Sequence, residues 1–304
     1  MKRNSKLTLA ILAILMTATI FTACKKTSSV APPSPIGGFN NSNEVGASSL
    51  KAHWTFDGNA NESSGIAPTT SVGSSFVTGI KGQALNLVNG YLVYPVIAAL
   101  NAATIGSVTV SAWIKTDNNG TQAECVFALS QGQAAQSDWN TGVVTMYLET
   151  SHPITYDDTL VLHSAFSTYA TGPRLGGDNI NDYGVRETDF KTVKGTNKWV
   201  HYVMRYDAVG SNIDLFANGI LVSNNNFRHR TTGSPAVGIG PIVTTLGTQA
   251  IIGAFPTAST GFALSANQPW QAKFNGSIDE LRFWNTALSD ADISSLYQLE
   301  LVGR

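Results

Sequence analysis

Alternating apolar and polar residues recur from Leu50 onward, and this two-residue period predicts β-strands. The segment LKAHWTF, which begins at Leu50, directs every second side chain to one face. The segments VTVSAWIKT, VVTMYLET, WVHYVMRYDA and GSIDELRFWN repeat the pattern further along the chain. In NIDLFANGILVS, the Asn218-Gly219 pair is typical of a tight turn between two antiparallel strands. Many short strands separated by turns predict an antiparallel β-sandwich.

One segment near the C-terminus has the period of a helix instead. Ser289 can cap its first turn, and Asp292 follows three residues later. Ile293, Leu296 and Tyr297 then share one helical face. The predicted fold is therefore all-β, an antiparallel jelly-roll sandwich with one short C-terminal helix.

Several residues within the strand patterns are expected to be buried framework rather than ligand contacts. Cys125 lies in the apolar run ECVFALS and is expected to behave as a small hydrophobic residue. We expect the same for most of the tryptophans that fall inside predicted strands. These are Trp54, Trp113, Trp199 and Trp284.

The first residues have the features of a bacterial lipoprotein signal. Lys2, Arg3 and Lys6 flank the start of an apolar run that is too short to span a bilayer comfortably. The run ends in FTACKK, which resembles a lipobox. The resemblance implies that residues 1–23 are a signal peptide and that Cys24 is lipidated. An ordinary secretory signal with an incidental cysteine is the alternative.

Residues 24–48 are rich in Ser, Pro, Gly and Asn, and we interpret them as a flexible tether. The folded domain is expected to span residues 49–304. Together with the lipid anchor, this organisation predicts a cell-envelope protein attached to a membrane, with the outer membrane favoured. The sequence leaves open which face of that membrane carries the domain.

The charge of the chain excludes one class of partner. It has 19 Lys and Arg residues and 20 Asp and Glu residues, giving a net charge of −1. No run of basic residues is available to neutralise phosphates, so nucleic acid is not expected as a ligand. A surface rich in Asn, Ser, Thr and Gly suits neutral polar ligands better.

Four segments carry a resemblance to a known family. They are LKAHWTFDGNANESSG, GIKGQALNL with TVSAWIKT, WVHYVMRYDAVGSNIDLFANGILVS, and FNGSIDELRFWNTALSDADISSLYQL. Together they resemble laminin-G-like jelly rolls of the concanavalin A-like lectin and glucanase superfamily. The resemblance spans residues 50–300 and implies the fold. It leaves function open, because this fold hosts binding modules, adhesion domains and hydrolases.

The resemblance also implies a structural calcium ion at the rim of the sandwich, held by Asp57, Asn59 and Asp279. The segment after Asp57 is not an EF-hand, because Glu62 stands where glycine is required and Pro68 where glutamate is required. Glu62 is a further candidate ligand. The alternative is that residues 57–59 form a simple turn.

No catalytic residue is predicted. The sequence contains no nucleophile elbow, zinc-binding H-E-x-x-H motif or phosphate-binding loop. A glycoside hydrolase needs two carboxylates across a cleft. Neighbouring acids occur in YDDTL, RETDF and SIDEL, but none matches the spacing of the superfamily's glucanases. A pair assembled from distant segments, and hence a divergent hydrolase, remains an alternative.

Aromatic and hydrogen-bonding residues outside the strand patterns are the candidate ligand site. Exposed aromatic faces beside amide, carboxylate and guanidinium groups suit carbohydrate recognition. We therefore predict a lectin-like protein that binds a glycan or polysaccharide. A protein-binding adhesion or scaffold module with an envelope partner is the alternative, as is simple packing of these loops. The candidate residues are Trp139, Trp270, Tyr156, Tyr169, Arg174, Asp178, Tyr183 and Arg186.

Overall fold

A computed structural model describes residues 33–149 and 158–304. Contacts divide the chain into one unit up to Ser34 and a second unit from Pro35 to Arg304, and the second unit is described below. The predicted signal peptide, Cys24 and Tyr156 lie outside the described residues. Within the described ranges, no helix is long and apolar enough to cross a membrane.

Strands are the main regular structure of the second unit. Within the described ranges, fourteen strands join in one sheet. They are β1 (Leu50–Trp54), β2 (Thr70–Thr78), β3 (Gln83–Val93), β5 (Val108–Thr116), β6 (Ala123–Ser130), β7 (Val144–Leu148), β9 (Leu162–Thr168), β10 (Leu175–Ile180), β12 (Val200–Asp207), β13 (Asn212–Ala217), β14 (Ile220–Leu221), β18 (Gln249–Ile252), β19 (Gln271–Ala272) and β20 (Phe274–Trp284).

The remaining elements are short strand pairs and helical turns. The strand pairs are β4 (Thr104–Gly106) with β17 (Ile242–Val243), β8 (Thr159–Leu160) with β11 (Val193–Lys194), and β15 (Thr231–Thr232) with β16 (Val237–Gly238). The helices are the 3₁₀ turns η1 (Ser42–Glu44), η2 (Ala47–Ser49), η3 (Ala98–Leu100), η5 (Asn225–Phe227) and η6 (Ala258–Thr260), and the α-helix α2 (Asp290–Leu301).

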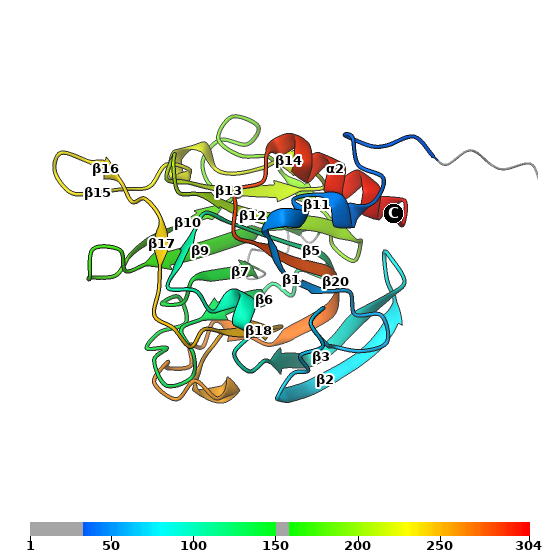
Figure 1. Cartoon of the computed structure of the whole chain (residues 1–304), viewed down its shortest axis with the longest axis horizontal. Coiled ribbons are helices and arrows are strands. Elements are labelled where there is room, and N and C mark those ends of the chain that lie inside the picture. The colour runs from blue at the N-terminus through cyan, green and yellow to red at the C-terminus, as the bar shows by residue number, and fades with distance from the viewer. Residues whose placement is uncertain (1–32, 150–157) are drawn as a thin grey trace, which may run out of the picture. The chain divides into compact units, whose positions relative to one another are not determined.

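The sheet curls into two layers that face each other (Figure 1). Its strand order is β10-β9-β7-β6-β18-β3-β20-β5-β12-β13-β14, with antiparallel pairing along this path. Strands β9 and β12 are far apart in this order, yet Ser164 Oγ lies 2.7 Å from Tyr202 Oη. The rings of Phe166 and Tyr206 also stack at 3.9 Å. We call β10 to β3 the first layer and β20 to β14 the second.

The predicted all-β antiparallel sandwich with a C-terminal helix is confirmed. Apolar residues of both layers form the central core, in which Phe127 of the first layer contacts Phe283 of the second. Helix α2 begins as predicted, because Ser289 Oγ accepts a hydrogen bond from the Asp292 N–H at 3.1 Å. Ile293 and Leu296 are fully buried against the outer face of the second layer.

The framework residues largely follow the prediction. Trp54, Trp113 and Trp284 are buried, and so is Cys125. Trp199 is the exception, because it is half-buried just before β12, where it lines a surface hollow. The alternating pattern determines the face of the sheet to which a side chain points only within a paired strand. Trp199 precedes the first paired residue of β12.

The compact unit begins at Pro35, within the segment predicted as a tether. The reason is Arg282, whose side chain is completely buried on β20. Its guanidinium donates to Ser42 O at 3.3 Å and to Asn43 Oδ1 at 3.0 Å, so the N-terminal segment supplies acceptors that the sheet lacks. Val45 is buried beside it.

Arg282 also joins two buried carboxylates. It forms an ion pair with Glu280 on the same strand, and Glu300 of α2 lies 3.0 Å away. Burial alone raises the pKa of Glu280, but the hydrogen bond with His53 and the charge of Arg282 outweigh it and hold the pKa below its usual range. Burial raises the pKa of Glu300 to about 7. This ionic cluster ties the N-terminal segment, β20 and α2 together.

Replacing Arg282 with methionine is expected to destabilise the domain by about 3–5 kcal/mol, because buried Glu280 loses its guanidinium partner and keeps only His53 at 2.9 Å and Lys81 at 3.8 Å. Denaturant unfolding measures the change in free energy. The double variant E280Q/R282M should recover a large part of the loss. A single variant as stable as the wild type would show that the cluster does not hold these segments together.

Candidate functional site

A hollow of about 410 Å³ opens on the outer face of the first layer. This face carries a second apolar cluster and, unlike the outer face of the second layer, is not covered by α2. We call this site the Trp139 hollow. It is lined by Trp139, Asn140, Tyr147, His163, Ala165, Arg174, Gly176, Gly177 and Asp178.

Strand register brings the floor of the hollow together. Tyr147 of β7 lies opposite His163 of β9, and Ala165 of β9 lies opposite Asp178 of β10. Since side chains two residues apart share a face, these residues point outward together. Gly176 leaves the floor open, and a Cβ atom there would lie 2.3 Å from the carbonyl oxygen of Phe166. Packing therefore requires glycine at this point.

His163 is the centre of a charged network. Its Nδ1 lies 2.9 Å from Glu149 Oε1, and its Nε2 lies 3.0 Å from Asp178 Oδ2. Its ring stacks on Tyr147 with 4.4 Å between ring centroids. Burial by itself lowers the pKa of His163, but the hydrogen bonds with Asp178 and Glu149 outweigh it and hold the pKa above its ordinary value. Asp178 also pairs with Arg230 at 2.7 Å.

Arg174 is the cation of the hollow that has no acidic partner. Its Nε donates to Ser167 Oγ at 2.9 Å, and one terminal nitrogen donates to Asn140 O at 3.0 Å. Within the described part of the chain, no carboxylate forms an ion pair with it. The two hydrogen bonds hold the guanidinium in place and leave other N–H groups for a ligand.

Trp139 and Trp270, predicted from their positions outside the strands, lie side by side. Their ring centroids are 5.1 Å apart, and each also contacts Phe255, at 5.5 Å for Trp139 and 5.3 Å for Trp270. Both indoles are half-buried rather than fully exposed. Edge-to-face contacts on several sides fix the orientation of Trp139.

The other predicted ligand residues do not join this hollow. Tyr169 is half-buried and donates to Thr141 O at 3.0 Å. Tyr183 is exposed and lies against Phe227, with 5.4 Å between the rings. Arg186 is exposed in the loop that follows β10. The structure thus brings together Trp139, Arg174 and Asp178 from the predicted set.

Sequence reasoning missed the pairing of Tyr147 with His163. Tyr147 belongs to the apolar segment VVTMYLET, and its outward direction follows from the strand period. The signal that placed it in the site was the cross-strand register with β9, which the sequence pattern does not contain.

Two of the three predicted calcium ligands, Asp57 and Asp279, bond to the turn between β2 and β3. Asp57 Oδ1 accepts from Gln83 N at 2.8 Å, and Asp279 Oδ2 accepts from Ile80 N at 2.8 Å. Burial raises the pKa of Asp279 to about 7. Asn59 instead accepts the N–H of Asn61. Among the described residues, no three His, Cys, Asp or Glu side chains gather as a metal site. Calcium therefore stays a prediction.

None of the adjacent acids considered for hydrolysis lines the Trp139 hollow. Asp158 pairs with Lys194 at 2.9 Å, and Asp189 accepts the N–H of Val185. Asp279 and Glu280 are buried, while Asp157 lies outside the described residues. The acid that does line the hollow, Asp178, is bound to the imidazole of His163, whose other nitrogen is bound to Glu149.

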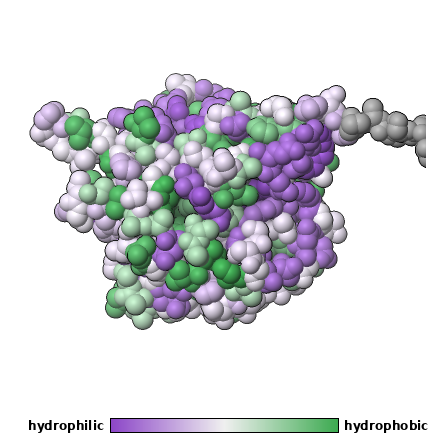
Figure 2. All heavy atoms as spheres, viewed as in Figure 1, coloured by the Kyte–Doolittle hydropathy of each residue, from purple (hydrophilic) through white to green (hydrophobic). Residues whose placement is uncertain are grey.

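On the face drawn in Figure 2, the apolar residues do not form one broad patch. In the view of Figure 2, hydrophobic and hydrophilic residues are interspersed, and the most hydrophilic area lies on the right. The exposed large apolar side chains include Val88, Val209, Leu246 and Leu264, which belong to separate strands and loops. This distribution suits a polar ligand better than a wide apolar interface.

Comparison with known proteins supports the fold. No protein-family model matches the sequence, and no curated protein matches it. The binding domain of Paraclostridial Mosquitocidal Protein 1 is similar with a TM-score of 0.50 at 13% identity, over 83% of this chain and 52% of that chain. This chain therefore spans about half the length of that binding domain, with which it shares a β-sandwich fold.

Two further solved structures are similar at lower TM-scores. Domain 4 of AbnA, a GH43 extracellular arabinanase from Geobacillus stearothermophilus, was solved with arabinotriose. It gives a TM-score of 0.49 at 20% identity, over 82% of this chain and 98% of that chain. The ligand-binding domain of botulinum neurotoxin serotype D was solved with N-acetylneuraminic acid. It gives a TM-score of 0.47 at 14% identity, over 84% of this chain and 52% of that chain.

The His163 network predicts a pH-dependent contribution to stability. Because the folded-state pKa lies above the ordinary value of 6.5, the stabilisation is complete below pH 6.5 and is lost as the pH rises through the folded pKa. His163→Gln should therefore cost about 1–2 kcal/mol more at pH 6 than at pH 9, as measured by urea unfolding. His229→Gln, at an exposed histidine, is the control. An equal cost at both pH values would contradict a protonated network.

Proposed function

We propose that the protein binds carbohydrate through the Trp139 hollow. The observation that carries the proposal is a half-exposed indole held beside the guanidinium of Arg174 and the carboxylate of Asp178. Aromatic faces provide apolar contact for the C–H groups of a sugar ring, while charged and amide groups hydrogen-bond its hydroxyls. These are the groups that lectin-like recognition requires.

The fixed position of these groups favours binding. Trp139 contacts Tyr147, Phe255 and Trp270 edge to face, so its indole has little freedom to lose on contact with a sugar. Arg174 is held by Ser167 and Asn140 in the same way. Groups that are already ordered lower the entropic cost of association. This matters for sugar ligands, whose contacts are individually weak.

We further propose that the domain works at the cell envelope as a lipid-anchored module. The basic residues, apolar run and FTACKK segment at the N-terminus support lipidation of Cys24. Several acyl chains give stable membrane attachment where one does not. The compact unit begins at Pro35, so residues 25–34 lie between it and the proposed anchor along the sequence.

A calcium ion at the turn between β2 and β3 is proposed as a stabilising group. Asp57 and Asp279 supply oxygen donors on either side of this turn, and calcium prefers such hard oxygen ligands. Backbone N–H groups currently bond to these carboxylates, so bound calcium would strengthen a junction that already exists. The ion would take no part in ligand choice.

Calcium removal tests this proposal. Calcium at 100 times its Kd stabilises a folded protein by about 2.7 kcal/mol, so a chelator should lower the Tm by roughly 5–10 °C. Asp57→Asn should abolish the calcium-dependent shift, whereas Asp207→Asn, at another turn carboxylate, should keep it. An identical Tm with and without calcium would argue against a site here.

Affinity electrophoresis through gels that contain different polysaccharides tests the function. The wild-type protein is expected to be retarded by one class of glycan, and the assay must detect a Kd near ~1 mM, about −4 kcal/mol. Trp139→Ala and Arg174→Gln should each weaken retardation at least about tenfold, equivalent to ~1.4 kcal/mol. Lys191→Gln, at an exposed cation elsewhere, should leave it unchanged.

The two variants protect the test against misfolding. Trp139 contacts the apolar cluster, so its removal can disturb the domain, but Arg174 is exposed and its loss should leave the fold intact. Retardation that persists in both variants would place the sugar site elsewhere. No retardation by any polysaccharide would overturn the proposal in favour of a protein partner in the envelope.

A further inference from the structure

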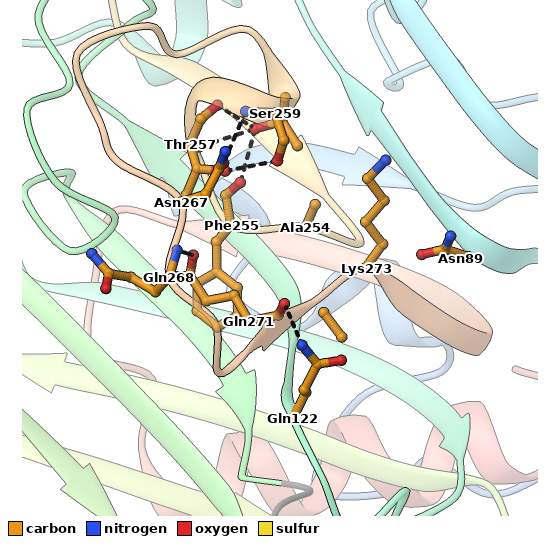
Figure 3. A pocket seen from close by; sticks show the side chains of 12 residues that line it. Asn89, Gln122, Ala254, Phe255, Thr257, Ser259, Asn267, Gln268, Gln271 and Lys273 are labelled. Atoms are coloured by element: carbon orange, nitrogen blue, oxygen red, sulfur yellow. Dashed lines mark hydrogen bonds between the residues drawn. The ribbon is translucent and has the colours of Figure 1, made fainter.

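A second hollow, of about 240 Å³, lies on the same layer, and five of its twelve lining residues carry side-chain amides (Figure 3). We call it the amide hollow. Figure 3 shows Lys273 and Asn89 on one side of it and Asn267 with Ser259 on the other. The polar groups that matter here are Asn89, Gln122, Asn267, Gln268, Gln271 and Lys273.

The amides are partly fixed by the chain and partly available. Gln122 Nε2 donates to Pro269 O at 2.8 Å, and Gln271 Oε1 accepts from Gln268 N at 3.2 Å. The other terminal atom of Gln271, Nε2, is buried and has no hydrogen-bond partner in the described residues. A buried donor without an acceptor costs free energy, which a ligand oxygen would recover.

Lys273 gives the amide hollow a positive charge. Its Nζ lies 5.0 Å from the ring centroid of Tyr91, and no described residue lining the hollow is Asp or Glu. Within the described part of the chain, Lys273 forms no ion pair. The hollow therefore has donors and a cation but no anion of its own.

The Trp139 hollow also contains a cation without an ion-pair partner, although the carboxylate of Asp178 lines this hollow. There His163 bridges Glu149 and Asp178, and Asp178 also pairs with Arg230, so these charges offset one another. Among the described residues, no carboxylate forms an ion pair with Arg174. The nearby carboxylate of Asp138 accepts the N–H of Trp139 and lines neither hollow.

An aromatic ridge connects the two hollows. Phe255 lines the amide hollow and contacts Trp139, which lines the other, at 5.5 Å. Trp270 touches both rings, at 5.3 Å and 5.1 Å. Phe255 itself is buried, and the half-exposed rings of Trp139 and Trp270 that pack on it suit successive units of one linear chain.

We infer that the ligand is an acidic oligosaccharide that spans both hollows, with its anionic groups paired to Arg174 and Lys273. This inference rests on the proposed carbohydrate-binding function. Carboxylate and sulfate groups both supply the required anion. Sugar units between the charged ones lie over the half-exposed rings of Trp139 and Trp270, which pack on buried Phe255.

Calorimetric titration of the full chain in detergent micelles tests the inference. The probes are a galacturonate hexamer, its fully methyl-esterified form, a galacturonate dimer and a sulfated galactan hexamer. The acidic hexamer, or the sulfated one, is expected to bind at least tenfold more tightly than the neutral ester. Raising the salt concentration from 50 to 500 mM should weaken binding of the acidic hexamer several-fold, because salt screens the ion pairs.

Lys273→Gln separates the two hollows. This variant should weaken binding of the acidic hexamer about five- to tenfold and leave the affinity for the dimer unchanged. Lys191→Gln should alter neither affinity. Equal affinity for the acid and its methyl ester, or no loss in Lys273→Gln, would overturn the inference and leave the proposed function standing. If none of these probes binds but the gels reveal a neutral glycan, the inference is likewise wrong.

Discussion

The completely buried charge of Arg282 is the constraint on which the rest of the domain depends. A buried guanidinium needs both counter-charge and acceptors. Glu280 supplies the charge, Ser42 and Asn43 supply acceptors from the N-terminal segment, and Glu300 lies against it from α2. Strand β20 also pairs with β1, β3 and β5. The two ends of the domain are thereby fixed to the strand that connects its layers.

This arrangement decides which surface is available for function. Helix α2 and the N-terminal segment cover the outer face of the second layer through Val45, Ile293 and Leu296. Among the described residues, α2 does not cover the outer face of the first layer, and the apolar cluster of this face ends in the half-buried rings of Trp139 and Trp270. An apolar cluster that reaches the surface between polar hollows is suited to a ligand with both C–H faces and hydroxyls.

The fold was largely predictable because its signals are local. The two-residue period marks the strands, and Ser289 with the following apolar residues marks the helix. Trp139, Arg174 and Asp178 were found because they depart from the strand pattern. The contact of Tyr147 with His163 depends on the register of β7 and β9, and the amide hollow combines residues from four distant segments. The packing of Ser42 and Val45 depends on the needs of Arg282. Each of these features depends on residues far apart in the sequence, so a local sequence pattern does not predict it.

The most direct measurement of the central claim uses the tryptophans as reporters, since the chain has 6 of them. Indole N–H resonances in a ¹H–¹⁵N spectrum, assigned by single Trp→Phe variants, would be followed during titration with a retained glycan. Binding at the Trp139 hollow predicts shifts of Trp139 and Trp270, with Trp54, Trp113 and Trp284 unmoved. A shift confined to Trp199, or saturation without movement of Trp139, would contradict the claim.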